Sequence, residues 1–356
     1  MKKSFNVLKN SLYLLLFAMS FTACEKEDLP NPEPIEALSG VFILNQGSDG
    51  LSNAGISYYD FETGEFRLDI ANQSLGDTGQ DMIAYGSKLY VSVFGSSRIT
   101  IFDLKSLARV KDINLKDGEN LHQPRSLVSY NGKVYATTVD GYVVRIDTVS
   151  LSQDGITPVG LNPEGIAAVD GKLYVANSGG YNWPDYNNTL SIVNIATFQE
   201  EETLTVGLNP NFVHADSYGN VYLTFWGNYF DIPGGFQQID TKTKTVTDIS
   251  ISANQDFVIM GDSLYFFGVT YDEDWNTSSS FGIYNVKAGQ LVHDHIITDG
   301  TTINTAYGIG VNPETQDVYI SDTDYSNRGI VYVFGPDGKK KNTLNVGINA
   351  CRFVFH

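Results

Sequence analysis

The chain has 356 residues and a formal net charge of −18, from 41 acidic and 23 basic side chains. An acidic chain without a basic cluster repels nucleic-acid phosphates and anionic lipid headgroups, so we expect no nucleic-acid partner. The 34 glycines, 21 tyrosines and 20 phenylalanines, without long stretches of helical periodicity, favour an all-β protein.

Residues 1–23 have the pattern of a bacterial lipoprotein signal peptide. A start containing three lysines precedes an apolar run over residues 12–21, which is too short for a comfortable membrane span. Phe21-Thr-Ala-Cys24 follows and resembles a lipobox, which implies that acyl chains on Cys24 are the only membrane attachment. Ordinary secretion with cleavage near Ala23 is the alternative.

Residues 24–39 are expected to form a tether. The run Glu25-Lys-Glu-Asp28 is acidic, and the prolines that follow it cannot help to pack a core. An acidic run behind a lipidated cysteine is similar to the signal by which some Gram-negative bacteria place lipoproteins on the cell exterior. This implies an outer-membrane location. Cys351 is the only other cysteine, so we expect no disulfide framework.

One sequence motif recurs from Gly40 to the C-terminus: a glycine or turn residue followed by an apolar strand centred on an aromatic residue. Gly171-Lys-Leu-Tyr-Val-Ala176 and Gly219-Asn-Val-Tyr-Leu-Thr224 are examples. The copies recur about every 45 residues, a spacing typical of a β-propeller with several short strands per blade. The central aromatic residues are Phe42, Tyr90, Tyr135, Tyr174, Tyr222, Tyr265 and Tyr319.

Each repeat is predicted to form four strands, which we name A to D from the axis outward. The aromatic motif forms strand B. Residues 346–355 match residues 206–213, which form a strand A, whereas residues 41–45 match a strand B. The two ends of the chain therefore complete one blade together and close the ring. For residues 40–356 we predict a seven-bladed β-propeller with four-stranded blades.

The loops between strands B and C concentrate aromatic side chains on one face of the predicted propeller. The three tryptophans fall in such loops of three consecutive blades. A large, partly apolar ligand would explain this gathering; packing of the long loops against each other is the alternative, and both can hold. The aromatic set is Trp183, Trp226, Trp275, Tyr181, Tyr186, Tyr229, Phe230, Tyr271 and Tyr325.

The starts of the A strands should line the central channel. A polar ring there could bind amide-rich or cationic groups of a ligand, or it could merely solvate a water-filled funnel. Alignment of the repeats places these residues at equivalent positions around the axis: Asp81, Arg125, Glu164, Asn211, Asp256, Tyr307 and Cys351.

Signatures of catalysis and of metal binding are weak. His293 and His295 lie on one side of an outer strand without an evident third ligand, which favours an exposed edge over a zinc site. Asp322 and Asp324 begin a run of oxygen ligands that lacks the glycine and distal glutamate of a calcium loop. Nucleophile-elbow, phosphate-loop and dinucleotide motifs are also missing. We expect a protein without catalysis, metal or cofactor.

An enzyme remains an alternative. Some propellers are hydrolases or lyases, and such an activity would need a metal or a pair of acids in the channel. Asp81, Glu164 and Asp256 are the candidates for that role.

Residues 40–356 resemble the YncE-like seven-bladed propellers. The resemblance lies in the Gly-Lys-Leu-Tyr-Val-Ala motif and in the Asn-Pro pairs at the start of strand A. The opening residues 41–47 and 53–60, behind a lipoprotein signal, are similar to the BtuG cobalamin-binding surface lipoproteins. That family more often has Glu where this chain has Gln46.

This resemblance implies capture of cobalamin or a related corrinoid on the loop face and its delivery to a BtuB-like TonB-dependent outer-membrane transporter. Trp183, Trp226 and Trp275 would then pack the corrin ring. A non-catalytic glycan- or protein-binding scaffold at the cell surface is the alternative.

Overall fold

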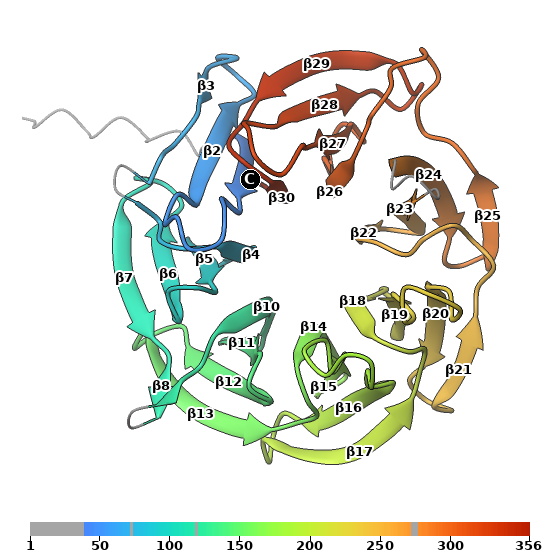
Figure 1. Cartoon of the computed structure of the whole chain (residues 1–356). Helices are drawn as coiled ribbons and strands as arrows, with labels where there is room; N and C mark the ends of the chain where they lie inside the picture. The colour runs from blue at the N-terminus through green and yellow to red at the C-terminus, as the bar shows by residue number, and fades with distance from the viewer. Residues whose placement is uncertain (1–38, 72–73, 118–119, 272–276) are drawn as a thin grey trace, which may run out of the picture. The chain divides into compact units, whose positions relative to one another are not determined.

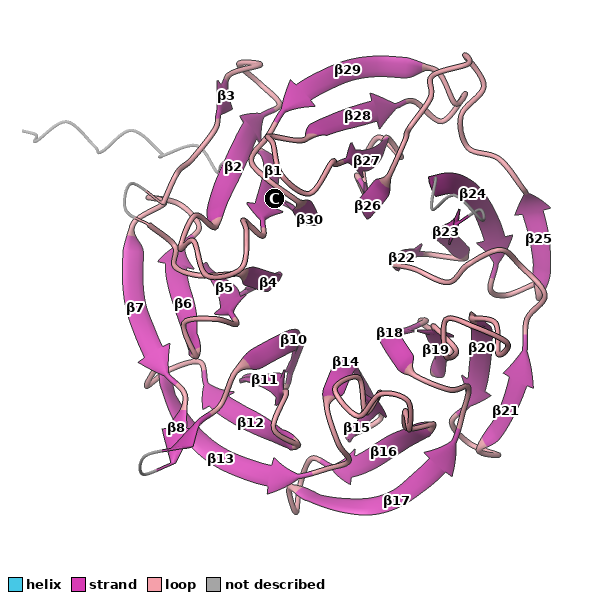
Figure 2. Ribbon diagram, viewed as in Figure 1, coloured by secondary structure: helices cyan, strands magenta, loops and turns pink. Residues whose placement is uncertain are grey.

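A computed structural model describes residues 39–71, 74–117, 120–271 and 277–356. The described strands form seven four-stranded antiparallel sheets arranged in a ring (Figures 1 and 2). This confirms the predicted seven-bladed β-propeller. The predicted signal peptide, Cys24 and most of the predicted tether lie outside the described residues. Among the described residues, no helix is long and apolar enough to cross a membrane.

The first three blades follow the predicted order of strands from the axis outward. Blade 1 consists of β30 (Ala350–Phe355), β1 (Gly40–Asn45), β2 (Gly55–Asp60) and β3 (Phe66–Arg67). Blade 2 consists of β4 (Gly79–Tyr85), β5 (Lys88–Val93), β6 (Arg98–Asp103) and β7 (Arg109–Asn114). Blade 3 consists of β10 (Pro124–Tyr130), β11 (Lys133–Thr138), β12 (Tyr142–Asp147) and β13 (Ser152–Pro158). Between blades 2 and 3, β8 (Lys116–Asp117) pairs with β9 (Asn120–Leu121).

The remaining four blades repeat this order. Blade 4 consists of β14 (Pro163–Val169), β15 (Lys172–Asn177), β16 (Thr189–Asn194) and β17 (Gln199–Thr205). Blade 5 consists of β18 (Pro210–Ala215), β19 (Asn220–Phe225), β20 (Gly235–Asp240) and β21 (Thr245–Asp248). Blade 6 consists of β22 (Phe257–Met260), β23 (Ser263–Tyr271), β24 (Thr277–Asn285) and β25 (Gln290–His293). Blade 7 consists of β26 (Ala306–Val311), β27 (Val318–Asp322), β28 (Ile330–Phe334) and β29 (Lys340–Asn345).

Blade 1 joins the two ends of the folded chain. Strand β30 pairs antiparallel with β1, and Phe42 lies opposite Val354. The backbone N–H of Gly40 donates to the carbonyl of His356 at 2.8 Å, and the reverse bond is 2.9 Å long. The ring is thus closed by hydrogen bonds between segments at opposite ends of the sequence, as the repeat pattern predicts.

Tight turns connect strands A and B on the face away from the long loops. Asn131 and Gly132 both have positive φ, as do Asp170 and Gly171. Two consecutive residues in this conformation make a type I′ turn, which matches the twist of an antiparallel hairpin. These turns set the register that places the aromatic residues of the B strands in the interior.

Side chains packed between neighbouring blades form most of the core. Tyr90 in β5 packs with Leu127 of the next blade. The seven central aromatic residues are all buried. Because each blade packs against a neighbouring blade on both sides, a C strand can be buried on both faces, as in β6, where Thr100 is as buried as its apolar neighbours. The outer strands are exposed and polar, which discourages pairing with other sheets.

Candidate ligand-binding site

A bulge near the start of strand A shapes the channel end that faces the B–C loops. In blade 3, Pro124 pairs with Thr138 and Leu127 pairs with Ala136, so Arg125 and Ser126 together lie opposite one residue of strand B. The pairing of strands A and B shifts at the corresponding place in five more blades. Such bulges re-aim side chains, and here they turn consecutive residues of strand A toward the axis.

The strand registers define a first ring of equivalent residues. They are Gln80, Arg125, Glu164, Asn211, Gln255, Tyr307 and Cys351. All seven line one cavity of about 340 Å³, which we call the mouth pocket. Gln46, Trp226, Tyr229 and Tyr325 complete its rim, and Phe212 and Arg352 contribute to its inner end.

The alignment of the repeats was wrong in two blades. The sequence predicts Asp81 and Asp256 in this ring, whereas the registers place Gln80 and Gln255 there. The two aspartates occupy the next position along strand A, together with Arg352 of β30. We call this set the second ring; it consists of Asp81, Ser126, Gly165, Phe212, Asp256, Gly308 and Arg352.

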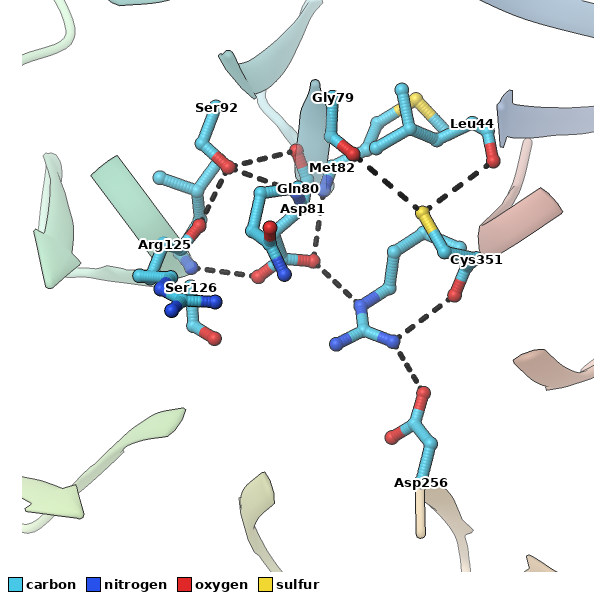
Figure 3. A network of polar contacts seen from close by, with 12 residues as sticks. Leu44, Gly79, Gln80, Asp81, Met82, Ser92, Arg125, Ser126, Asp256 and Cys351 are labelled. Atoms are coloured by element: carbon cyan, nitrogen blue, oxygen red, sulfur yellow. Dashed lines mark hydrogen bonds and ion pairs between the residues drawn. The ribbon is translucent and has the colours of Figure 1, made fainter. Parts of the chain in front are cut away.

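Arg352 connects residues of the second ring across the channel. Figure 3 labels three residues to which Arg352 bonds: Asp81, Asp256 and Cys351. Its Nε donates to Asp81 Oδ1 at 2.9 Å, and its Nη1 donates to Asp256 Oδ2 and to the Cys351 carbonyl. The guanidinium also lies over the ring of Phe212, 5.1 Å from its centre. Arg352 therefore links strand A of blade 1 with those of blades 2, 5 and 6.

Burial and these carboxylates set the titration of the network. Burial disfavours the charge of Arg352, but Asp256 and Asp81 outweigh this cost and raise the pKa of Arg352 above its ordinary value. Burial also raises the pKa of the Cys351 thiol to about 12, although Arg352 opposes that rise. Asp81 accepts a further hydrogen bond from the N–H of Leu127 at 2.7 Å, so it joins blades 2 and 3. These contacts give Asp81 a structural role.

A second cavity of about 370 Å³ lies beyond Arg352. We call it the inner chamber, and it shares Ser126, Phe212 and Arg352 with the mouth pocket. Asp81, Asp256 and His214 line it along with apolar residues of the A strands. The second ring thus forms the floor of the mouth pocket.

Arg125 and Glu164 form the charged side of the mouth pocket. Arg125 Nη2 lies 3.2 Å from Glu164 Oε1 and 3.5 Å from the Tyr181 hydroxyl. Ser178 Oγ donates to the same Glu164 oxygen at 3.4 Å. Burial raises the pKa of the Glu164 carboxyl, against the opposing effects of Arg125 and Ser178. The guanidinium of Arg125 lies over the ring of Phe94, 5.0 Å from its centre.

Amide and phenol groups form the facing side of the pocket. The hydroxyl of Tyr307 donates to Gln46 Oε1, and Gln46 Nε2 donates to Gln80 Oε1 at 3.5 Å. The ring of Tyr307 meets that of Tyr325 edge to face, with centroids 5.7 Å apart. Gln46, in the loop after β1, is thus part of the pocket wall.

The aromatic loop residues divide into two groups. Trp226 and Tyr186 both pack against Tyr229, with ring centroids 6.3 and 6.0 Å from it. Trp183 and Phe230 instead expose 65% and 78% of their surface. Packing between loops and an exposed aromatic surface therefore coexist on this face.

The remaining aromatic predictions are partly outside the described structure. Tyr181 is exposed beside Arg125. Trp275 and the side chain of Tyr271 lie outside the described residues, so their places on the rim stay predictions.

The groups considered for catalysis or metal binding are scattered. Among the described residues, no cluster of three or more His, Cys, Asp or Glu could hold a metal ion. The rings of His293 and His295 are 6.2 Å apart on the outer edge of blade 6. Asp322 accepts the backbone N–H of Thr305, and Asp324 accepts that of Asn327. Both aspartates therefore stabilise loop backbone.

Several pocket residues were missed in the sequence. Gln80, Gln255, Phe212 and Arg352 lie next to predicted positions, but nothing in their own residue types marks them. A signal is present in strand B: Ser92 donates at 2.6 Å to the carbonyl of Arg125 in the next blade and accepts the N–H of Asp81 in its own bulge. Thr137 makes the corresponding bonds with Ser126 and Glu164. Ser321 accepts the N–H of Gly308 and donates to the carbonyl of Ala350, one residue before the first ring. A small hydroxyl residue two positions after the central tyrosine thus marks the bulge in blades 2, 3 and 7, whereas Ala176 and Leu44 occupy this position in the bulged blades 4 and 1.

Comparison with known proteins supports the fold. No family model matches the chain, and no curated protein matches it. Among solved structures, a candidate 6-phosphogluconolactonase from Bacteroides fragilis has a TM-score of 0.63 at 14% identity, over 91% of this chain and all (100%) of that one. A second such protein, from Bacteroides uniformis, has a TM-score of 0.62 at 12% identity, over 89% of this chain and 99% of that one.

A chain of the hydrazine synthase of Kuenenia stuttgartiensis has a TM-score of 0.61 at 16% identity, over 73% of this chain and 77% of that one. At such identities these similarities show the propeller fold and no narrower family.

Proposed function

We propose that this protein is a surface lipoprotein that captures cobalamin or a related corrinoid in the mouth pocket, without catalysis, and passes it to a BtuB-like TonB-dependent transporter of the outer membrane. Anchoring through Cys24 and the proline-rich tether would let the propeller reach a transporter in the same membrane. The proposal combines the sequence resemblance with the chemistry of the pocket.

The observation that carries the proposal is the amide-rich lining of the mouth pocket. Four carboxamide side chains line it: Gln46, Gln80, Asn211 and Gln255. Its charged groups are already paired, Arg125 with Glu164 and Arg352 with two aspartates. Such a lining suits a large neutral ligand with many hydrogen-bonding groups rather than a phosphorylated or strongly charged one.

Aromatic residues supply the apolar contact that a corrin ring needs. Trp226, Tyr229, Tyr307 and Tyr325 line the pocket. A corrinoid is larger than this cavity, so it would also contact the exposed rim, where Trp183 and Tyr181 stand. Aromatic side chains on a rim are frequent anchors of binding energy.

Titration of the full chain, purified in detergent, with cyanocobalamin tests the proposal. Calorimetry and tryptophan fluorescence should both report saturable binding with one ligand per chain. Trp226→Ala should weaken binding by at least about tenfold, the loss expected for a contact of about 1.4 kcal/mol. Absence of heat at micromolar protein would remove corrinoids as the ligand.

The second candidate is the glycan- or protein-binding scaffold. It is favoured by Trp183 and Phe230, which are exposed and lie outside the pocket lining. Binding of free sugars in the same titration, with quenching lost in Trp183→Ala, would favour this scaffold. Hydrolysis of a sugar-phosphate lactone, the activity suggested by the names of two structural neighbours, would instead establish an enzyme.

A further inference from the structure

Two buried donors on one side of the mouth pocket have no hydrogen-bond partner among the described residues: Nε of Arg125 and Nε1 of Trp226. Buried polar groups are almost always hydrogen-bonded, and an unsatisfied one destabilises the fold. Both residues line the pocket, Arg125 from blade 3 and Trp226 from blade 5. Their unused donors point to a ligand that supplies an acceptor.

Glu164 and Asn211 occupy the first ring next to these donors. Each has hydrogen-bonding groups that no described residue uses. The ion pair with Arg125 and the hydrogen bond from Ser178 both involve Oε1 of Glu164, and within the described residues no hydrogen bond reaches Oε2. Asn211 is only 6% exposed, and within the described part of the chain its side chain makes no hydrogen bond. The amide of this pocket-lining residue is therefore available to bond to a ligand.

The backbone brings these groups together. Gly165 follows Glu164 in the bulge of β14, and a Cβ atom there would lie 2.4 Å from the carbonyl oxygen of Asn211. Only glycine therefore allows strand A of blade 4 to approach strand A of blade 5 so closely. Arg125, Glu164 and Asn211 come from three consecutive blades and form one continuous arc of the first ring.

We propose that Arg125, Glu164, Asn211 and Trp226 form a subsite that binds a neutral carboxamide group of the ligand. This inference rests on the proposed function only in that the ligand occupies the mouth pocket. A carboxamide offers two N–H donors and one carbonyl acceptor. The N–H groups can donate to Glu164 Oε2, while the carbonyl accepts from the amide of Asn211 and from the unused donor of Trp226 or Arg125.

Other chemical groups match this set less well. A ligand carboxylate would place a second negative charge beside Glu164, and like charges at short range disfavour binding. An ammonium group has no acceptor for the donors of Trp226 and Asn211, and it would face Arg125. The subsite should therefore distinguish an amide from the corresponding acid, and the ligand should turn its carboxamides toward blades 3–5.

Small probes test the subsite directly. Saturation-transfer NMR on the full chain at pH 7 compares benzamide, benzoate and benzyl alcohol. Benzamide should bind at least about tenfold more tightly than benzoate. Trp226→Phe, which keeps a ring but removes the N–H, and Asn211→Leu should each weaken benzamide by about tenfold. Glu164→Gln should bring the ratio of benzamide to benzoate affinity close to one. Lys172→Met, at an exposed ion pair outside the pocket lining, should leave that ratio unchanged.

Cyanocobalamin titrations of the same proteins separate the two proposals. Selective benzamide binding without any cyanocobalamin binding would support the subsite and overturn corrinoid capture. Unchanged cyanocobalamin affinity in Trp226→Phe and Asn211→Leu would overturn the subsite and leave capture standing. Equal affinities of the wild-type chain for benzamide and benzoate, or no benzamide binding, would also overturn the subsite.

Discussion

Arg352 joins four blades through a single side chain. Its guanidinium reaches Asp81 and Asp256 and lies over Phe212. Both carboxylates are nearly buried. An intact buried ion pair adds little net stability, but removal of one partner leaves an uncompensated buried charge that destabilises the fold strongly. Arg352 is therefore important because its removal would leave two buried carboxylates without their counter-charge.

Arg352→Met should therefore destabilise the propeller strongly. It leaves Asp81 and Asp256 buried without their counter-charge, a change that typically costs about 3–5 kcal/mol. Denaturant unfolding at pH 7 measures the loss. Lys172→Met is the matched control, because Lys172 pairs with Glu201 in an exposed position where such pairs contribute less than about 1 kcal/mol. Equal losses in the two variants would contradict this reading of Arg352.

At the level of the element, a hydroxyl of strand B fastens the bulge of strand A in blades 2, 3 and 7. The Ser92 hydroxyl accepts the N–H of Asp81 and donates to the carbonyl of Arg125, so it connects its own bulge with the next blade. Thr224 occupies the same position in blade 5, but its hydroxyl is buried without a partner among the described residues. Ser92 and Thr224 thus occupy equivalent positions in their blades, but only the Ser92 hydroxyl makes hydrogen bonds.

This pair gives an internal comparison of the bulge contact. Ser92→Ala leaves a buried N–H and a buried carbonyl without this partner and should cost about 1–3 kcal/mol. Thr224→Val removes a hydroxyl that bonds to nothing described, so it should be neutral or slightly stabilising. Thermal unfolding of both variants measures the difference. Similar behaviour of the two would show that the hydroxyl does not hold the bulge.

The contact between the A strands of blades 3 and 4 carries a titratable group. Burial raises the pKa of Glu164, so the folded chain binds a proton at this site more readily than the unfolded chain does. Arg125 is the charged group that faces it. Stability from this site should therefore increase as the pH falls from neutral through the raised pKa toward the ordinary value of 4.5.

Comparison with Glu164→Gln isolates this effect. Relative to the variant, the wild-type chain should gain stability as the pH falls through that window, because the buried carboxylate becomes neutral. Glu201→Gln is the control with the opposite sign, since hydrogen bonds from Asn194 and Lys172 lower the pKa of Glu201. The stability that the Glu201 carboxylate contributes to the wild-type chain is present above its ordinary pKa and is lost as the pH falls. Urea unfolding at several pH values measures both, and slopes of the same sign would contradict the assignment.

The sequence predicts the molecule well where each blade repeats the same physical requirement. A tyrosine or phenylalanine is buried between neighbouring blades in every B strand, so the repeat gives the number of blades. Within strand A the alignment succeeds at Glu164 and Asn211, whose strands begin with Asn-Pro. It fails at Asp81 and Asp256, where glycine or asparagine stands at the proline position and the register is not marked.

The contacts across the channel could not be predicted from the repeat. Arg352 and Asp256 belong to different blades, and their pairing depends on how far one side chain reaches across the ring. The unused donors of Arg125 and Trp226 likewise become apparent only when every neighbouring acceptor has a position. Repeats report local packing, whereas a binding site at the axis depends on the closed ring.

For the whole molecule, closure through blade 1 should control stability. Strand β30 pairs with β1 along its length and also places Arg352 at the axis and Phe353 against Tyr319 of blade 7. A chain that ends at Asn349 would expose the edge of β1 and lose the Arg352 contacts together. We expect this truncated chain to unfold at a markedly lower denaturant concentration than the full chain.

A peptide of residues 348–356 added to the truncated chain should restore stability in proportion to its concentration, because a segment that binds only the folded state shifts the equilibrium by mass action. The same peptide with Arg352→Met should restore less, since it supplies the strand pairing without the counter-charge for Asp81 and Asp256. Circular dichroism during denaturant unfolding measures both. If the truncated chain is as stable as the full chain, ring closure through blade 1 contributes nothing to the free energy of unfolding. If the two peptides rescue equally, the clamp at the axis contributes nothing beyond the strand itself.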